Sequence, residues 1–200
     1  MKYQIKFHSL WHCGSGLSAG ADLDTLVIKD TNKMPFIPGK TLKGLIKEAV
    51  EDYLFFTGQN SIDSIQKLFY KTFGDESKGE VGCAFFSNAN LEIEEYNAIV
   101  SNKLQDYLYT GISSTAISEE TGTAKSHSLR RIQAVIPCIM YAEIENLPSE
   151  FIPYIEKGLS LIKRMGQNRN HGLGRCDFLI SKKGGEKLNY NLNVHLNQTL

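Results

Sequence analysis

Apolar and polar residues alternate at the start of the chain. Tyr3, Ile5 and Phe7 are separated by single polar residues, and a period of two is that of a β-strand with one buried face. The pattern therefore predicts a strand over residues 2–10. A glycine-rich loop follows it from residue 14.

After residue 38 the apolar spacing becomes that of an amphipathic helix. Apolar residues recur three and four positions apart, which places them on one side of a helix. They are Leu42, Leu45, Ile46, Ala49, Val50, Tyr53 and Leu54. Pro38 and Gly39 are unfavourable inside a helix and mark its start. The sequence predicts a helix over residues 41–56, with Thr41 as its N-cap.

The remaining segments also divide into strand and helix patterns. Helices are predicted over 62–74 and from an N-cap at Ser149, strands at 83–86, 131–144, 176–181 and 190–196, and a polar hairpin over 110–128. The order β-α-α-β-loop-β-α-β is the split βαβ pattern of a ferredoxin-like domain. The predicted fold class is α+β, with an antiparallel sheet, helices on one face and a single domain over residues 1–200.

Charge and composition limit the classes of function. The net charge is zero, which argues against binding nucleic acid through bulk charge but permits a local basic track. Cations cluster at three places in the sequence. They are Lys40, Lys43 and Lys47; Arg130 and Arg131; and Lys163, Arg164, Arg169 and Arg175.

The four cysteines are far apart and form no CxxC pair, so we expect them to be small buried residues rather than disulfides or zinc ligands. No apolar run is long enough to cross a bilayer, and the N-terminus lacks an apolar signal core. We expect a cytoplasmic protein with no membrane partner.

Two acids follow the glycine-rich loop. Asp22 and Asp24 are two residues apart, so in an extended segment both carboxylates point to the same side. Carboxylate oxygens are the ligands that Mg²⁺ and Mn²⁺ prefer, and such a cation beside a phosphate can assist its cleavage. The alternative is ordinary turn chemistry, which Asp often serves in a glycine-rich loop.

A second candidate site is the loop over residues 166–175. Its glycines allow close approach of the backbone to a ligand, and its arginines can pair with phosphates. The candidate ligand-binding residues here are Arg169, Asn170, His171, Gly172, Gly174 and Arg175. His171 is either a general base or a hydrogen-bonding loop residue. The start of the predicted helix, with Lys40, Thr41, Lys43 and Lys47, is a further phosphate site or an ordinary solvated helix end.

Together these segments resemble a known family. The motifs that carry the resemblance are VIKD, MPFIPGKTLKG, TAISEETGTA and RMGQNRNHGLGRCDF. In this order they resemble the RAMP superfamily of CRISPR-associated proteins, and most of all the backbone subunit of type III effector complexes. The resemblance extends from about Ile5 to Ile180.

The resemblance implies an RRM-like core, a β-hairpin thumb over residues 110–129, and a filament of copies along a guide RNA with other effector subunits. It also implies cleavage of bound target RNA by a loop aspartate with Mg²⁺ or Mn²⁺. Alignment on VIKD puts this acid at Asp24, with Asp22 as second choice. Arg130 and Arg131 are RNA-binding candidates beside this thumb.

Two alternatives remain open from the sequence. One is a structural RAMP subunit that binds RNA without cutting it. The other is a metal-independent endoribonuclease that processes guide RNA with His171 or His12 as the base.

Overall fold

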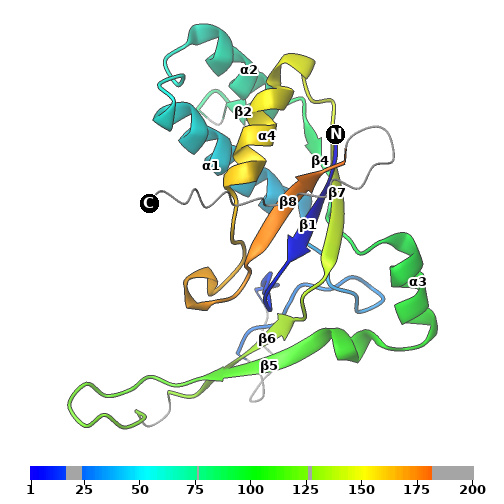
Figure 1. Ribbon diagram of the computed structural model, residues 1–200, viewed down its shortest axis with the longest axis vertical. Helices are drawn as coiled ribbons and strands as arrows, with labels where there is room; N and C mark the ends of the chain where they lie inside the picture. The colour runs from blue at the N-terminus through cyan, green and yellow to red at the C-terminus, as the bar shows by residue number, and fades with distance from the viewer. Residues whose placement is uncertain (17–23, 76, 126–127, 182–200) are drawn as a thin grey trace, which may run out of the picture.

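The computed structural model describes residues 1–16, 24–75, 77–125 and 128–181 (Figure 1). The predicted strand 190–196 and Asp22 lie outside the described residues. A four-stranded antiparallel sheet forms the centre, in the order β4-β7-β1-β8. Its strands are β1 (Lys2–Phe7), β4 (Phe85–Phe86), β7 (Ile139–Glu145) and β8 (Cys176–Ile180).

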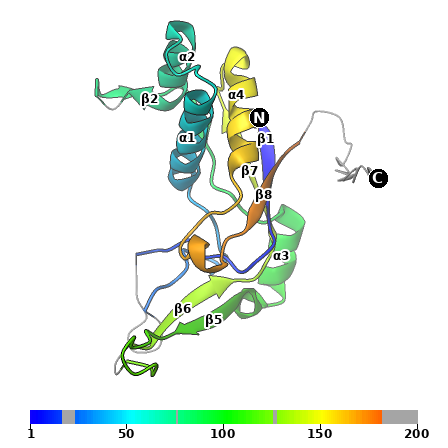
Figure 2. The same ribbon diagram turned by 60° about the vertical axis from the view of Figure 1, so that its left-hand side comes forward.

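Two helices cover one face of this sheet (Figure 2). They are α1 (Gly39–Phe56), which connects β1 to β4, and α4 (Ile152–Leu161), which connects β7 to β8. Each helix joins two strands that are not neighbours, so the topology is that of a ferredoxin-like fold. The predicted α+β class and ferredoxin-like core are confirmed.

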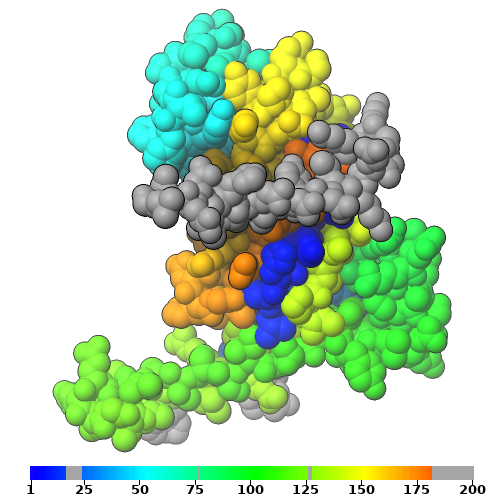
Figure 3. Space-filling model, viewed as in Figure 1, coloured from blue at the N-terminus to red at the C-terminus, as the bar shows by residue number. Residues whose placement is uncertain are grey.

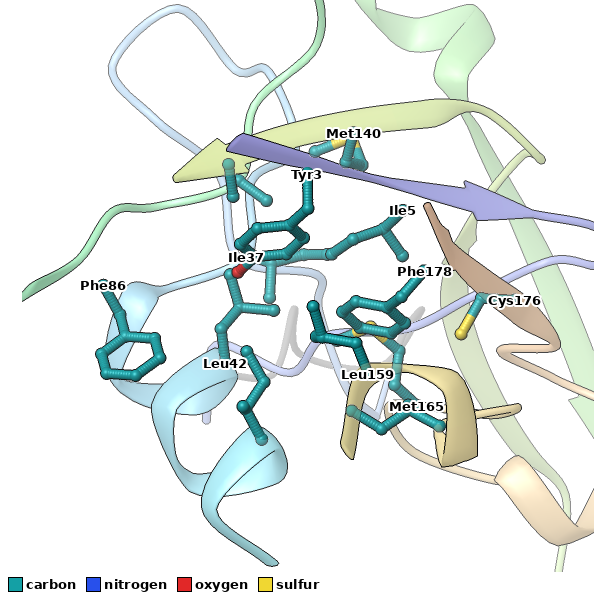
Figure 4. Close-up of a cluster of buried hydrophobic side chains, with 14 of the residues drawn as sticks. Tyr3, Ile5, Ile37, Leu42, Phe86, Met140, Leu159, Met165, Cys176 and Phe178 are labelled. Carbon is teal, nitrogen blue, oxygen red and sulfur yellow. The ribbon is translucent and has the colours of Figure 1, made fainter. Parts of the chain in front are cut away.

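The core lies between the sheet and these helices (Figure 4). Alternate residues of each strand enter it, including Ile5, Met140 and Phe178, and they meet Leu42 of α1 and Leu159 of α4. In β1 the alternate residues that point away from the core are polar, namely Lys2, Gln4 and Lys6.

Insertions account for the rest of the chain. After α1 come α2 (Asp63–Phe73) and a short hairpin of β2 (Gly74–Asp75) and β3 (Glu80–Val81). Between β4 and β7 lie α3 (Ile93–Ser101), the 3₁₀ turn η1 (Gln105–Leu108), β5 (Tyr109–Ser114) and β6 (Arg130–Val135). Two further 3₁₀ turns are η2 (Ser149–Phe151) and η3 (Arg169–His171).

Strands β5 and β6 pair over six residues and form a long hairpin that extends from the body of the molecule (Figure 3). We call residues 109–135 the thumb hairpin. The single strand predicted over 131–144 is instead divided into β6 and β7, and Pro137, which has no N–H to donate, lies at the break.

Several local predictions were wrong. Thr41 does not cap α1: the N-cap is Pro38, and the Gly39 N–H is bonded by the side chain of Asn88 at 2.8 Å. Ser149 makes no capping bond either, because a 3₁₀ turn precedes α4. Cys83 is exposed rather than buried.

The start of α1 packs directly on the backbone of β4. A Cβ at Gly39 would lie 2.0 Å from the carbonyl oxygen of Phe86, whereas a Cβ at Gly44 of the same helix would meet nothing within 4 Å. Only glycine therefore fits at position 39.

We predict that Gly39→Ala lowers the free energy of unfolding by about 1–3 kcal/mol, because the new methyl group forces the helix away from β4. Gly44→Ala is the matched control and should raise it by up to about 1 kcal/mol, since alanine is the better helix former. Urea unfolding of both variants measures this. Equal effects of the two substitutions would contradict the close packing.

Candidate nucleic-acid interface

Asp24 is fixed to the base of the thumb hairpin by two hydrogen bonds. Its backbone N–H donates to the carbonyl of Arg131 at 2.8 Å, and the backbone N–H of Arg131 donates to its carboxylate at 2.6 Å. The next residue, Thr25, continues the pairing, since its carbonyl accepts from the N–H of Gln133 at 3.1 Å. The segment thus runs parallel to β6 and forms an isolated β-bridge to it between Thr25 and Ile132.

The two ends of the glycine-rich loop are held together next to this strand. Ser15 N–H donates to the carbonyl of Leu26, and Ile28 N–H donates to the carbonyl of Cys13, each at 2.9 Å. These bonds bring residues 13–15 and 26–28 side by side. Asp24 therefore lies at the end of a closed loop, and its position is set by backbone pairing on both sides.

Asp24 remains exposed, although one of its carboxylate oxygens accepts the Arg131 N–H. Among the described residues no group of three His, Cys, Asp or Glu could hold a metal ion. Asp24 can thus supply one carboxylate to a divalent cation. That fits Mg²⁺, which is often bound by one or two carboxylates together with substrate phosphates and water.

His12 lies under the same junction and is fully buried. Its Nδ1 contacts the carbonyl oxygen of Gln133 in β6, and its Nε2 has no hydrogen-bond partner among the described residues. A catalytic base must reach the proton that it removes. His12 is closed off from solvent in this arrangement, so its contacts are those of a residue that connects the loop to the thumb hairpin.

Arg131 and Arg130 project from opposite faces of β6, because successive side chains of a strand alternate. The guanidinium of Arg131 lies over Gly111 of β5, where an added Cβ would come within 2.9 Å of its Nε. The ammonium of Lys29 lies 3.9 Å from the ring centroid of Tyr109. Lys29, Tyr109 and Gly111 were not among the predicted site residues, because their roles depend on contacts across the fold.

The three lysines of α1 line a groove together with the β2–β3 hairpin. Lys40, Lys43 and Lys47 follow one side of the helix, and Val81 of the hairpin is 92% exposed at the facing edge. The predicted phosphate site at free helix N–H groups was wrong in part, since Asn88 occupies the N–H of Gly39. The groove offers an anion the three lysine side chains beside exposed Thr41, and Glu80 of the hairpin also lines it.

The glycine-rich loop 166–175 packs against the segment that follows β1. Gly174 is buried, its N–H donates to the carbonyl of Leu10 at 2.7 Å, and a Cβ there would lie 1.8 Å from the carbonyl oxygen of Met165. Gly174 therefore serves contacts within the protein. The exposed members of the predicted set are Arg169, Asn170, His171, Gly172 and Arg175.

The cations of residues 163–175, which include this loop and the end of the segment before it, lie close to acids. Lys163, Arg164 and Arg169 line one pocket with Glu48 and Asp52 of α1. On the sheet edge, Lys163 is 3.4 Å from Asp177, whose carboxylate also contacts His8 at 2.8 Å. The bond from His8, with help from Lys163, lowers the pKa of Asp177. Part of the positive charge of the loop is thus neutralised locally.

The predicted cations therefore lie in three places: the α1 groove, the loop 163–175 and the thumb hairpin. Direct hydrogen bonds join two of the predicted residues that are far apart in the sequence, Asp24 and Arg131. Figures 1 and 2 show that the segments after β1, the loop before β8 and the base of the thumb hairpin gather at one end of the sheet.

Comparison with known proteins now defines the class. The sequence model of the RAMP superfamily matches residues 4–177, so the chain belongs to the RAMP superfamily. No curated protein sequence matches. Within the described residues, no helix is long and apolar enough to span a membrane.

Two solved structures have the same fold over most of the chain. A type III-B Cmr-beta complex bound to cognate target RNA contains a chain with a TM-score of 0.67 and 12% identity, covering 89% of this chain and 95% of that one. The apo state of type III-B Cmr-beta gives a TM-score of 0.66 and 13% identity, covering 88% and 95%. At this identity the likeness establishes the fold.

We predict that Asp24→Ala speeds hydrogen exchange of the Arg131 amide about tenfold, because the amide loses an acceptor worth about 1.4 kcal/mol. Asp24→Asn keeps an oxygen acceptor and should have a smaller effect. Exchange measured by NMR on the isolated protein tests this. The Gln133 amide, which bonds to a backbone carbonyl, is the internal control, and an unchanged Arg131 amide would contradict the tether.

Proposed function

We propose that this protein is a backbone subunit of a type III CRISPR effector complex in the cytoplasm. It binds guide RNA together with copies of itself and other effector subunits, and it cleaves the bound target RNA through Asp24 and Mg²⁺ or Mn²⁺. The observation that carries this proposal is the exposed carboxylate of Asp24, bonded to the base of a long hairpin in a RAMP fold.

The binding half of the proposal is supported by the distribution of charge. A chain with zero net charge gains little from long-range attraction to RNA, so its affinity must come from local contacts. Lys40, Lys43 and Lys47 supply such contacts along α1, and exposed Arg169 and Arg175 supply others. Contacts of this type go to phosphates and carry no sequence information, as a subunit that accepts any guide requires.

The cleavage half rests on Asp24. In the expected reaction, the ribose 2′-oxygen bonds to the adjacent phosphorus and the bond to the next 5′-oxygen breaks, which leaves a cyclic phosphate and a 5′-hydroxyl. A divalent cation, when bound, stabilises negative charge on the phosphate. Asp24 is the side chain that would hold it, and the two bonds to Arg131 keep the carboxylate at a fixed place beside the thumb hairpin.

A subunit that binds without cutting is the second candidate. It is favoured by the absence of a three-ligand cluster among the described residues, since Asp24 must then share its cation with the RNA. Asp22, the second choice for the acid, lies outside the described residues. A guide-processing nuclease with His12 as its base is not supported, because His12 is buried. His171, the other candidate base of such a nuclease, is exposed.

The test uses complexes assembled with guide RNA from wild-type protein and from Asp24→Asn. This variant keeps the acceptor for the Arg131 N–H and loses the charge that a cation needs. We expect target affinity to change less than about twofold and Mg²⁺-dependent cleavage to fall at least about a hundredfold. Asp63→Asn, an exposed acid on α2, is the control and should cut at the wild-type rate.

Normal cleavage by the Asp24→Asn complex would remove Asp24 from the reaction. Wild-type complexes that bind target and leave it intact with Mg²⁺ or Mn²⁺ would instead support the non-cutting subunit.

A further inference from the structure

One face of the thumb hairpin carries two cations that are held in place by their neighbours. Tyr109, Gly111 and Ser113 alternate onto this face of β5. Arg131 is paired with Ser113 in the ladder and therefore points to the same face. Arg130 is paired with Ser114 and points to the other.

Arg131 reaches along this face toward the body of the molecule. Its ladder partner is Ser113, but its Nε and Nη2 lie 2.9 and 3.2 Å from the position of a Cβ on Gly111, which is two residues nearer the body. A side chain at position 111 would occupy the space that the guanidinium fills. Gly111 thus provides the surface on which the guanidinium lies.

Lys29 is held over the neighbouring position. Its ammonium lies over the ring of Tyr109 at 3.9 Å from the centroid, in the range of a cation–π contact. The Tyr109 hydroxyl donates to the carbonyl of Lys33 at 2.6 Å, which fixes the ring. Because Tyr109 and Gly111 are two residues apart on an extended strand, these two positions are about 7 Å apart.

Asp106 is the acid that interacts with Lys29, and it raises the pKa of the ammonium, whereas burial, the larger influence, lowers it. The carboxylate of the adjacent Asp30 is engaged by the N–H groups of Asn32 and Met34 and by the Tyr96 hydroxyl at 2.6–2.9 Å. Lys29 is half-buried, and a partly desolvated cation gains more from an incoming phosphate than a solvated one does.

Asp24 borders the same element. It bonds to the backbone of Arg131 from the edge of β6 that faces away from β5. Arg131 therefore holds Asp24 through its main chain and carries the phosphate-binding guanidinium on its side chain. The spacing between them is set by a strand rather than by flexible linkers.

We propose that Lys29 and Arg131 bind phosphates of the target strand next to the phosphodiester bond that is cleaved at Asp24. The absence of a side chain at Gly111 allows the Arg131 guanidinium to take this position. The inference rests on the proposed function and adds a positioning pair to it. Arg131 acts because its planar guanidinium can bind a phosphate through two hydrogen bonds. Arg130, equal in charge and adjacent in sequence, has no part in this step.

The experiment compares Arg131→Ala and Gly111→Ala in complexes assembled with guide RNA, with Lys157→Ala, which removes an exposed cation of α4, as the control. Arg131→Ala should slow target cleavage at least about tenfold, as expected for a misplaced scissile group. It should also reduce the slope of log affinity for the target against log salt by about 0.7, the value for one phosphate contact of a single strand. Lys157→Ala should change the cleavage rate by less than about twofold.

Gly111→Ala keeps every charge and places a methyl group in an extended strand that accepts alanine. It should slow cleavage about as much as Arg131→Ala does. In the Arg131→Ala background it should have no further effect, because it acts only by displacing that guanidinium. Thermal melting of each isolated variant checks that the fold is retained.

Additive effects of Gly111→Ala and Arg131→Ala, or equal effects of Lys157→Ala and Arg131→Ala, would overturn the inference. Its failure is distinguishable from failure of the proposed function. If Asp24→Asn complexes cut normally, the proposed reaction is wrong, whereas the target affinities and salt slopes of Arg131→Ala and Lys157→Ala still decide whether this face binds the strand.

Discussion

Two hydrogen bonds between Asp24 and Arg131 join parts of the chain that are 107 positions apart. One part is the loop after the first strand of the sheet, and the other is the base of the thumb hairpin inserted between β4 and β7. Without this pairing the acid would belong to a long loop with no fixed neighbour. With it, the carboxylate, the strand edge and the Arg131 side chain form one unit.

The sheet explains why these parts meet. β1 lies between β7 and β8, so the segments that leave β1 and enter β7 and β8 start from neighbouring strand ends. Trp11 pairs with Val135 at 2.8–3.0 Å, and Gly174 bonds to Leu10 at 2.7 Å. Buried residues under this end of the sheet support all three segments. Among them, Phe7 stacks on Trp11 with 4.6 Å between the ring centroids. These three segments thereby meet at one end of the sheet, while α1 and α4 cover one of its faces.

Periodicity predicted the parts of the fold that depend on local sequence. The apolar stripes of α1 and α4 and the alternation of β1 appear in the structure, since burial of one face is what those patterns encode. The cap at Thr41 was wrong because Asn88, far along the chain, bonds to the first N–H of the helix. The strand at β4 is only two residues long, and Phe85 is 58% exposed.

The candidate site was predictable in part for the same reason. Asp24 could be proposed from its loop and from the VIKD motif, and Arg131 from its charge. Nothing local indicates that Gly111 supports a guanidinium or that Lys29 lies on Tyr109, because both contacts cross between strands and loops. The cations lie in three separate regions rather than on one local track. Acids line two of these regions: Glu48 and Asp52 beside the loop before β8, and Glu80 beside the lysines of α1.

The central claim is that Asp24 and the face of β5 lie beside the same few nucleotides of bound target RNA. The most direct measurement is photocrosslinking of assembled complexes on target RNA with one 4-thiouridine at a time, with the attached residues identified by mass spectrometry. The account predicts that nucleotides flanking each cut site attach to the segments around residues 24, 111 and 131. Attachment of those nucleotides to other regions, with none at these three, would contradict it.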